Sequence, residues 1–388
     1  MEVIYLDHNA TTPLRPEVRS AMDPFLGEVF GNPSSLHAIG RAAADAVEIA
    51  RSQIAAALDV DEATVHFTAG GTEADNWALK GVLEADRLMT GDHRRLLIST
   101  VEHHAVLDSA VALGRRGFGI TNHPVDSAGQ LDPASVMDAV DSGPVPLLVS
   151  LLHANNETGV LQPLEQIGAG LRERGILFHI DAVQSFGKVD VHPEVLGADL
   201  VSISAHKING PKGCGALYIR PGVELEPLLH GGGQERGRRP GTLHAAGIVG
   251  FGAAVVAAGG DRDSTQERLR RLRDRLEGQL IERIGDVVVH GAGAPRLANT
   301  LNVSFRGVEA EAVLLGLDQA GVAAASGSAC TSGRPEPSHV LLAMGVEPRL
   351  AAGAVRFSLG WGNDEAQIDA VLEQLPPIIA RLRDLSVF

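Results

Sequence analysis

Short apolar segments alternate with amphipathic segments along the first two thirds of the chain. We predict strands at 94–100, 146–153, 176–182, 199–207 and 215–220, with helices at 103–117 and 164–175. Several of these strands are continuously apolar instead of alternating, which is typical of strands covered on both faces of a sheet. Crossover helices between such strands predict a mainly parallel sheet and therefore an α/β fold.

The pattern changes after about residue 260. Leucine recurs at 269, 272, 276 and 280, which predicts an amphipathic helix over 266–283, and we expect its arginines on a solvated face. Short strands at 287–291, 299–305 and 355–360 alternate with helices at 309–320, 338–344 and 364–383. We therefore predict a smaller α+β domain packed on the large one.

Composition narrows the classes of function. The 388 residues carry a net charge of −15, which argues against nucleic acid or an anionic membrane as a direct partner. The apolar stretch 245–260 is short for a membrane span, so we predict a buried helix there. Two cysteines are too few for a disulfide framework or a four-thiolate metal site, and no secretory signal is visible. We expect a cytoplasmic protein without a bound metal.

Two predicted strand ends carry groups suited to charged ligands. The segment 66–81 passes through paired glycines into a helix starting at Thr72, where backbone N–H groups and the Thr72 hydroxyl could hold an anion. A simple Thr cap explains the same pattern. Asp181 ends an apolar strand at the edge where α/β sheets bind ligands. Its carboxylate either has a cationic partner (a pyridinium, a metal or an arginine) or caps a helix.

The chain has few lysines and cysteines, so each one can be judged by its own neighbours in the sequence. Lysine occurs only at 80, 188, 207 and 212, and Lys207 follows a strand that ends with Ser204 and His206 nearby. A partly desolvated lysine there is a Schiff-base nucleophile, although a surface lysine fits the spacing equally well. Cys330 lies in a loop of small residues, which favours a reactive thiol. Cys214, between two glycines, is expected to be a core residue.

Three further residues and one loop also have simple structural interpretations. His103 starts a predicted helix and Asn156 follows a strand, so a helix cap and a turn are the simplest interpretations. Arg356 lies inside an apolar strand and needs a carboxylate partner from the protein or from a substrate. The Gly/Arg-rich stretch 230–242 is most simply a flexible linker.

Taken together and in chain order, these segments resemble the cysteine desulfurases, pyridoxal-phosphate enzymes of the class-V aminotransferase family. The resemblance spans the chain and rests on the following motifs: YLDHNATTP, FGNPSSLH, GGTEADN, EHHAVLD, NNETGV, DAVQS, SAHKINGPKG, HGGGQERGRRPGT, SGSACTS and RFSLG. The cysteine loop is similar to that of the IscS/NifS-like branch, which serves iron–sulfur assembly and nitrogenase maturation. The resemblance implies a large domain (15–260) with a mainly parallel seven-stranded sheet. A small α+β domain (1–14 and 261–388) would carry the cysteine loop, at about 322–338.

The resemblance also implies roles for individual residues. Lys207 would hold pyridoxal 5′-phosphate covalently, Asp181 would pair with the pyridinium nitrogen, and His103 would stack on the ring and act as acid or base. Asn156 would contact the ring hydroxyl, with Gln184 beside it. The phosphate would be bound by residues that share small or polar side chains: Gly71, Thr72, Ser204, His206 and Thr242. Thr242 would come from a neighbouring subunit, which implies a homodimer.

The implied reaction takes sulfur from L-cysteine. Arg356, with Asn32 beside it, would bind the substrate carboxylate as a bidentate pair, and Lys207 would remove the α-proton. Cys330 would attack the substrate sulfur, giving L-alanine and a Cys330 persulfide. The partners would be sulfur acceptors for iron–sulfur cluster assembly or tRNA thiolation, and a cluster bridged by Cys330 and a scaffold is one such arrangement. Two alternatives remain open: a selenocysteine lyase, or another pyridoxal-phosphate enzyme of the same superfamily.

Overall fold

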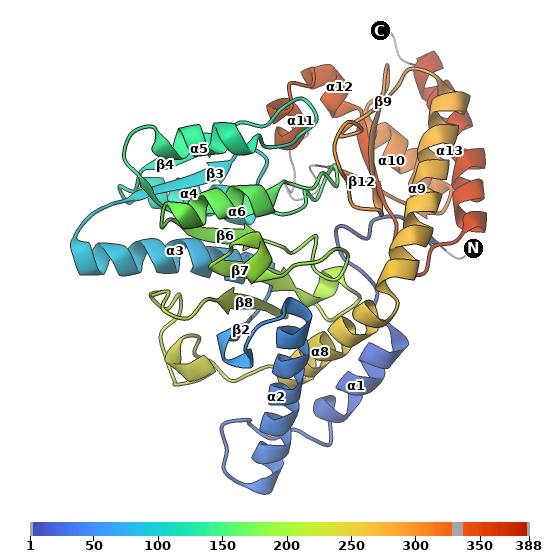
Figure 1. Cartoon of the computed structure of the whole chain (residues 1–388). Coiled ribbons are helices and arrows are strands. Elements are labelled where there is room, and N and C mark those ends of the chain that lie inside the picture. Colours follow the sequence, from blue (N-terminus) through green and yellow to red (C-terminus); the bar gives the residue numbers. More distant parts are fainter. Residues whose placement is uncertain (1–2, 328–336, 386–388) are drawn as a thin grey trace.

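The computed structural model describes residues 3–327 and 337–385, and its main element is a seven-stranded sheet (Figure 1). In spatial order its strands are β2 (Val65–Thr68), β8 (Gly215–Ile219), β7 (Leu200–Ser204), β6 (Leu177–Asp181), β5 (Pro146–Leu152), β3 (Arg95–Ser99) and β4 (Ile120–His123). Only β8 runs antiparallel to its neighbours in this sheet. The mainly parallel, seven-stranded α/β sheet is confirmed.

Helices cover both faces of this sheet. They are α1 (Pro16–Leu26), α2 (Ala38–Leu58), α3 (Gly71–Thr90), α4 (His104–Gly114), α5 (Pro133–Asp141), α6 (Leu164–Glu173), α7 (Pro193–Leu196) and α8 (Ala245–Gly260). One apolar cluster joins α3 and α4 to the sheet, and a second joins α2, α5, α6 and α8 to the opposite face. Leu96, Leu97 and Ile98 of β3 alternate between the two clusters. This alternation explains the continuously apolar strands, because every side chain of such a strand is buried.

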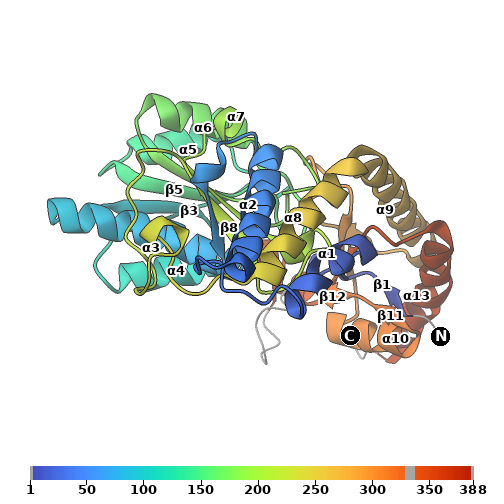
Figure 2. The same cartoon turned by 90° about the horizontal axis from the view of Figure 1, so that it is seen from below.

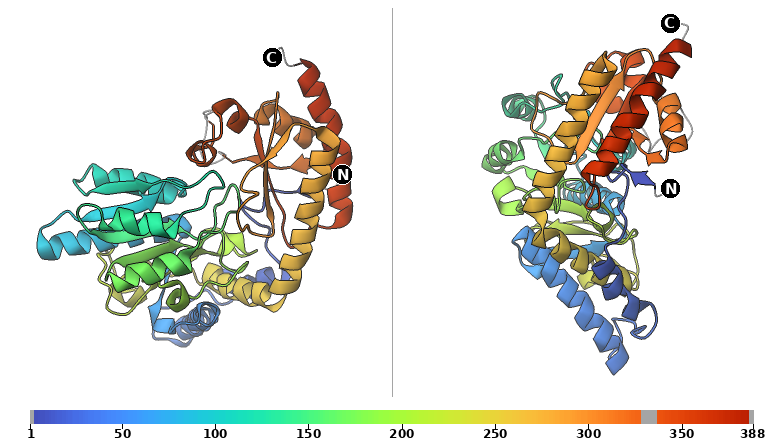
Figure 3. Two further views of the ribbon diagram at one scale, coloured as in Figure 1. Left: turned by 45° about the horizontal axis from the view of Figure 1, so that its top comes forward. Right: turned by 90° about the vertical axis from the view of Figure 1, so that its right-hand side faces the viewer.

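The apolar stretch 245–260 forms α8, which packs against α1 and α2 as a buried helix (Figure 2). No helix in the described part of the chain combines the length and apolarity needed to cross a membrane. At Asp261 the chain bends from α8 into α9 (Arg262–Ile284), which runs alongside the second domain (Figure 3). The proposed domain boundary at residue 260 falls at this bend.

The C-terminal part has its own sheet and core. Its four-stranded sheet has the order β12 (Ala325–Ser326), β13 (Ala354–Ser358), β10 (Thr300–Phe305) and β9 (Val287–Val289). Its helices are α10 (Ala310–Gln319), α11 (His339–Ala343), α12 (Pro348–Ala352) and α13 (Glu365–Leu385), and α13 lies beside α9. The first strand of the chain, β1 (Ile4–Tyr5), pairs with β11 (Val322–Ala323). The N-terminus is therefore part of the same core as the C-terminal elements, to which it contributes Leu6.

Two arginine-rich segments pack more closely than the sequence suggested. Arg273 of α9 is 7% exposed and donates to the Leu297 carbonyl, so this arginine does not lie on a solvated face. In the loop 230–242, the 3₁₀ turn η3 (Glu235–Gly237) carries a buried carboxylate. Glu235 accepts hydrogen bonds from both terminal nitrogens of Arg51 and from the Phe67 amide of β2. This ion pair attaches the loop to the sheet, so the flexible-linker interpretation is replaced.

We expect Glu235→Gln to lower the free energy of unfolding by about 2 kcal/mol, because it removes the buried one of the two carboxylates that pair with Arg51, the other being the exposed Glu48. Chemical denaturation would measure the change. Glu194→Gln is the matched control, since Glu194 pairs with Arg172 at the surface and its loss should cost less than about 1 kcal/mol. Equal losses in the two variants would contradict the anchoring role of Glu235.

Candidate active site

The candidate residues follow the carboxyl ends of strands that run in one direction. Asp181 is the last residue of β6, and Asn156 follows β5. His103 follows β3, Lys207 ends the 3₁₀ turn η2 (Ala205–Lys207) after β7, and Thr72 lies in the first turn of α3 after β2. Carboxyl ends of codirectional strands meet at one edge of a sheet, which is where α/β folds bind ligands.

These residues meet around two neighbouring cavities. The first, of about 300 Å³, is lined among others by Gly71, Thr72, His103, Asn156, Asp181, Gln184, His206, Lys207 and Arg356. The second, of about 800 Å³, shares Gly71, Thr72 and His206 with the first and adds Ser204. The larger cavity therefore adjoins the one that contains the lysine and the aspartate, along the start of α3 and at His206.

Asp181 supplies a carboxylate at the base of the smaller cavity. Its Oδ1 accepts the Val183 amide at 2.9 Å. Burial raises the pKa of Asp181 to about 6, although the Val183 hydrogen bond and the charge of Lys207 act in the opposite direction. The ionised carboxylate is therefore costly in the protein alone, and a cationic group bound in the cavity would stabilise it.

Lys207 is held by the N-terminal segment. Its Nζ donates to the carbonyl of Asn9 and, at 2.9 Å, to the carbonyl of Ala10. Both carbonyls belong to the YLDHNATTP motif at the start of the chain. These two backbone carbonyls therefore hold the Lys207 amine at the edge of the smaller cavity.

The start of α3 forms an anion-binding surface. Gly70 precedes the helix with a φ of 149°, a value that favours glycine, and no side chain caps the first turn. A Cβ on Gly71 would lie 2.5 Å from Cγ2 of Val183, so a larger residue at this position would displace the loop that follows Asp181. The exposed N–H groups and the Thr72 hydroxyl face the shared cavity lining, where the helix dipole favours negative charge.

The two histidines of the site are neutral. Burial, the largest influence, lowers the pKa of His103 to about 4, and the charge of Lys207 lowers it further. His103 Nδ1 accepts the Ala105 amide at 3.1 Å, so the neutral ring carries its proton on Nε2. Burial likewise lowers the pKa of His206 to about 4, and its Nδ1 contacts the Thr11 hydroxyl at 3.2 Å. His103 is thus both a helix cap and a potential proton donor at Nε2.

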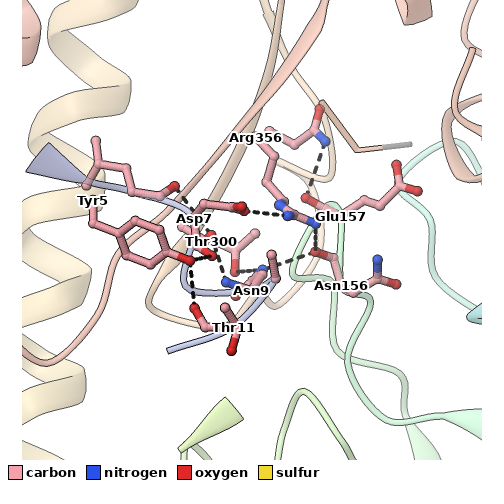
Figure 4. A network of polar contacts seen from close by, with 12 residues as sticks. Tyr5, Asp7, Asn9, Thr11, Asn156, Glu157, Thr300 and Arg356 are labelled. Atoms are coloured by element: carbon pink, nitrogen blue, oxygen red, sulfur yellow. Dashed lines mark hydrogen bonds and ion pairs between the residues drawn. The ribbon is translucent and has the colours of Figure 1, made fainter. Parts of the chain in front are cut away.

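Arg356 has two partners within the chain (Figure 4). Its Nη2 lies 2.7 Å from Asp7 Oδ1, and its Nη1 donates to the Asn156 carbonyl at 3.1 Å. The carboxylate partner that the sequence demanded is therefore Asp7. Nε of Arg356 is buried and has no hydrogen-bond partner, so the guanidinium keeps N–H groups that a ligand could use beside these two contacts.

Gln184 is oriented from both ends. Its Nε2 donates to the Asn9 carbonyl at 2.8 Å, and its Oε1 accepts from Lys188 at 3.2 Å. Burial lowers the pKa of Lys188 to about 7. The amide group is therefore held with its remaining N–H available to a ligand.

The sequence did not single out several residues of this region. Asp75 lies one helical turn after Thr72 and lines the smaller cavity, and burial together with Asp181 raises its pKa. Glu102, one residue before His103, is fully buried, which raises its pKa to about 8. The spacing of Asp75 and Thr72 on one helix face was the available signal for the first. A buried Glu beside a strand end gives no such signal.

The role of every candidate residue stays a prediction, and three candidates are not among the residues that line the cavities. Asn32 and Thr242 line neither cavity. Asn32 lies in the loop between α1 and α2, where its Oδ1 accepts the Ser34 amide. Cys330 falls outside the described residues. Cys214, in contrast, is buried as expected, which raises its pKa to about 12.

The described residues contain no group of three or more His, Cys, Asp or Glu side chains able to hold a metal ion.

Comparison with known proteins identifies the family. The model of the class-V aminotransferases matches residues 4–371. The chain is 47% identical to a cysteine desulfurase from Nostoc sp., over all of this chain and 96% of that protein. It is 45% identical to the cysteine desulfurase IscS of Methanosarcina thermophila, over 99% of this chain and 94% of the relative. The chain belongs to the cysteine desulfurases, within the class-V aminotransferase family.

A solved structure agrees with this assignment. A NifS-like protein superposes with a TM-score of 0.89 at 36% identity, covering 98% of this chain and all of that one. The fold and the IscS/NifS-like resemblance expected from the sequence are both confirmed. As a cysteine desulfurase, the enzyme acts on L-cysteine, which offers the carboxylate, amine and thiol that the cavity must accommodate.

We expect Asp181→Asn to stabilise the desulfurase without its ligands, and to do so more at high pH. The pKa of Asp181 rises from 3.8 to about 6 on folding. The unfolded chain therefore releases this proton first, and the wild type loses stability as pH rises from about 4 to 6. Thermal unfolding at pH 4.5 and 7.5 should show the advantage of the variant growing with pH.

Asp141→Asn is the control of opposite sign, because the exposed Asp141 has a pKa lowered by its hydrogen bond to Arg174. That variant should be slightly less stable than the wild type at pH 7.5, with the difference shrinking in acid. A wild-type protein that is more stable than Asp181→Asn at pH 7.5 would contradict the burial cost.

Proposed function

We propose that this desulfurase binds pyridoxal 5′-phosphate in the two adjoining cavities and transfers the sulfur of L-cysteine to Cys330. The carrying observation is that Lys207, Asp181, Arg356 and the start of α3 all line the smaller cavity. An amine, a carboxylate, a guanidinium and an anion-binding helix start are the groups that this cofactor and an amino acid require together.

The described residues fit the cofactor without rearrangement of the fold. Asp181 is a buried carboxylate that a pyridinium would stabilise, and Lys207 is the amine that would hold the aldehyde. Gly71, Thr72, Ser204 and His206 surround the space for a phosphate. His103 would lie against the ring, while Asn156 and the oriented Gln184 would serve its hydroxyl. When bound, the cofactor supplies a ring that withdraws the electrons released at the substrate α-carbon.

The protein's own groups then divide the work. Arg356 binds the substrate carboxylate and fixes the α-carbon in the cavity. Nζ of Lys207, a residue that lines the same cavity, would take the α-proton of the substrate. Neutral His103 holds a proton on Nε2 that can be donated within the cavity. Low solvent access around Asp181 strengthens each of these interactions.

The sulfur step balances in atoms and electrons. The thiolate of Cys330 attacks the sulfur of the substrate and forms a new S–S bond. The bond between that sulfur and the substrate β-carbon breaks, its electron pair stays with the carbon, and the carbon takes up a proton. The α-carbon regains the proton that Lys207 took, and the products are L-alanine and a Cys330 persulfide. The sulfur of Cys330 and the sulfur of the substrate are each oxidised by one electron, and the β-carbon is reduced by two.

The persulfide would pass to sulfur-acceptor proteins of the cytoplasm, for iron–sulfur cluster assembly or tRNA thiolation. A cluster held jointly by Cys330 and a scaffold protein is one form of this transfer. Cys330 carries the sulfur on a residue of the chain itself, which fits delivery by protein–protein contact without direct contact to nucleic acid or a membrane.

We further propose that the enzyme is a homodimer. The loop that carries Asn32 and the helix ends beside it expose four apolar side chains: Leu26, Phe30, Leu36 and Ile39, of which Phe30 is 74% and Leu36 is 89% exposed. This loop lies at the outer end of the large domain (Figure 1), and none of the four side chains lines either cavity. A second copy would cover these side chains and would bring Thr242, and by the same symmetry Asn32, to the partner's cavity.

The reaction is tested with L-cysteine, a thiol reductant and the enzyme loaded with pyridoxal phosphate. We expect equal amounts of alanine and sulfide. Lys207→Ala should lower both by at least about 10²-fold, because it removes the base at the α-carbon. Cys330→Ala should abolish sulfide release while the yellow colour of the bound cofactor remains.

Two other outcomes would contradict the proposal. A yellow protein that is inactive on L-cysteine but releases selenide from L-selenocysteine would favour the selenocysteine lyase. A colourless protein that cannot be loaded with pyridoxal phosphate would overturn the cofactor proposal.

The dimer is tested by replacing Phe30 and Leu36 with serine together. We expect the wild type to sediment as a dimer and the double variant to shift towards the monomer with weaker cofactor retention. Leu315→Ser is the matched control, because Leu315 is 60% exposed on α10 of the small domain. A wild-type monomer, or a double variant that sediments like the wild type, would contradict the proposal.

A further inference from the structure

The turn after β5 fixes a buried glutamate directly beside the cofactor site. Glu157 is 2% exposed and follows Asn156 in the chain. The side-chain oxygen of Asn155 accepts the amides of Glu157 at 2.9 Å and of Thr158 at 3.0 Å. The Asn155 amide group in turn donates to the Val101 carbonyl at 3.0 Å. The backbone of Glu157 is therefore held by the loops that follow both β3 and β5.

The side chain of Glu157 points away from Arg356 and towards the small domain (Figure 4). Its Oε2 accepts a hydrogen bond from the hydroxyl of Ser338, a residue that is 4% exposed. The same oxygen lies against Gly327, where a Cβ would overlap with it. Oε2 of Glu157 thus lies against Gly327 and accepts a hydrogen bond from Ser338, which are described residues on either side of 328–336.

The residue after Ser338 makes a second attachment. His339 contacts the Glu102 carbonyl through Nε2 at 3.0 Å, and its ring packs edge-on against His104 with centroids 4.9 Å apart. Glu102 and His104 are the chain neighbours of His103. The segment that follows the cysteine in sequence is therefore attached next to two cavity residues, His103 and Asn156.

Both contacts of the Glu157 carboxyl are close to Cys330 in the sequence. Gly327 comes three residues before Cys330, and Ser338 comes eight residues after it. Glu157 therefore contacts the chain on both sides of the residue that is proposed to receive sulfur.

We propose that Glu157 is a positioning residue for the sulfur-transfer half of the reaction, acting by holding Gly327 and Ser338 against the turn that carries Asn156. The inference rests on the proposed function, because it needs Cys330 to be the residue that receives sulfur. It assigns Glu157 no contact with cofactor or substrate. Its loss should therefore separate the two halves of the reaction.

The experiment compares two readouts on the loaded enzyme. The first is sulfide release from L-cysteine. The second is exchange of the α-proton of L-alanine with deuterated water, followed by NMR, which needs Lys207 and the cofactor but no thiol at 330. We expect Glu157→Ala to lower kcat for sulfide by about 10²-fold and Ser338→Ala by about 10-fold, since a displacement of about 1 Å costs on that order. Both variants should keep wild-type α-proton exchange and wild-type KM for L-cysteine.

Two further variants guard against a merely structural effect. Glu157→Gln keeps an oxygen that accepts from Ser338 and should retain sulfide release within about 3-fold of the wild type. Ser304→Ala also loses one buried hydrogen bond, to His290, but lies away from this contact and should change neither readout.

The outcomes are distinct. Sulfide release and α-proton exchange that fall together in Glu157→Ala and Ser338→Ala, or sulfide release that falls in neither, would overturn the positioning role. A wild type that makes no sulfide, or a Cys330→Ala variant that still makes it, would overturn the proposed function and this inference with it. When the wild type makes sulfide and Cys330→Ala does not, the Glu157 and Ser338 variants alone decide whether Glu157 positions the sulfur-transfer step.

Discussion

One buried residue, Asn9, makes hydrogen bonds to both domains and to Lys207. Its amide N–H donates to the Ser358 hydroxyl and its side-chain nitrogen donates to the Thr300 hydroxyl and the Asn156 carbonyl. Its own carbonyl accepts from Lys207. Asn9 is 1% exposed, so each of these groups would be costly to leave without a partner. The N-terminal segment therefore connects the small-domain sheet to the carboxyl edge of the large sheet. The smaller cavity lies between these parts, so its width depends on this connection.

Electrostatics in the cavity follow from burial. Asp75, Asp181 and Glu102 are carboxyl groups in one dry region, and burial raises the pKa of each. Like charges in such a region cannot all ionise, and Asp181, with the Val183 amide and Lys207 beside it, is the one best able to carry the negative charge. Burial opposes ionisation of the neighbouring carboxyls as well. This arrangement favours Asp181 as the anionic position that a cationic ligand would meet.

Periodicity predicted most of the fold, because strands covered on both faces and amphipathic helices leave clear patterns. Strand ends likewise indicated Asp181 and Lys207, since the carboxyl edge of a parallel sheet follows from local sequence order. The contacts of Asn9, Asp7 and Glu157 could not be predicted in this way. Each depends on tertiary contacts between segments more than a hundred residues apart, such as Asp7 with Arg356 and Glu157 with Ser338. The glycine and arginine content of the loop 230–242 led to a wrong prediction of a flexible linker. Composition alone does not reveal that the buried ion pair between Glu235 and Arg51 attaches this loop to the sheet.

The contact between Arg356 and Asp7 has a consequence for selectivity. A buried guanidinium with no carboxylate would be unstable, so the chain supplies one of its own. In the proposed role of Arg356, an incoming α-carboxylate would meet a guanidinium that already pairs with an internal anion. Asp7 would then weaken the attraction of Arg356 for any anion. A ligand would have to supply further contacts in the cavity to bind well, which would favour an amino acid over a simple acid.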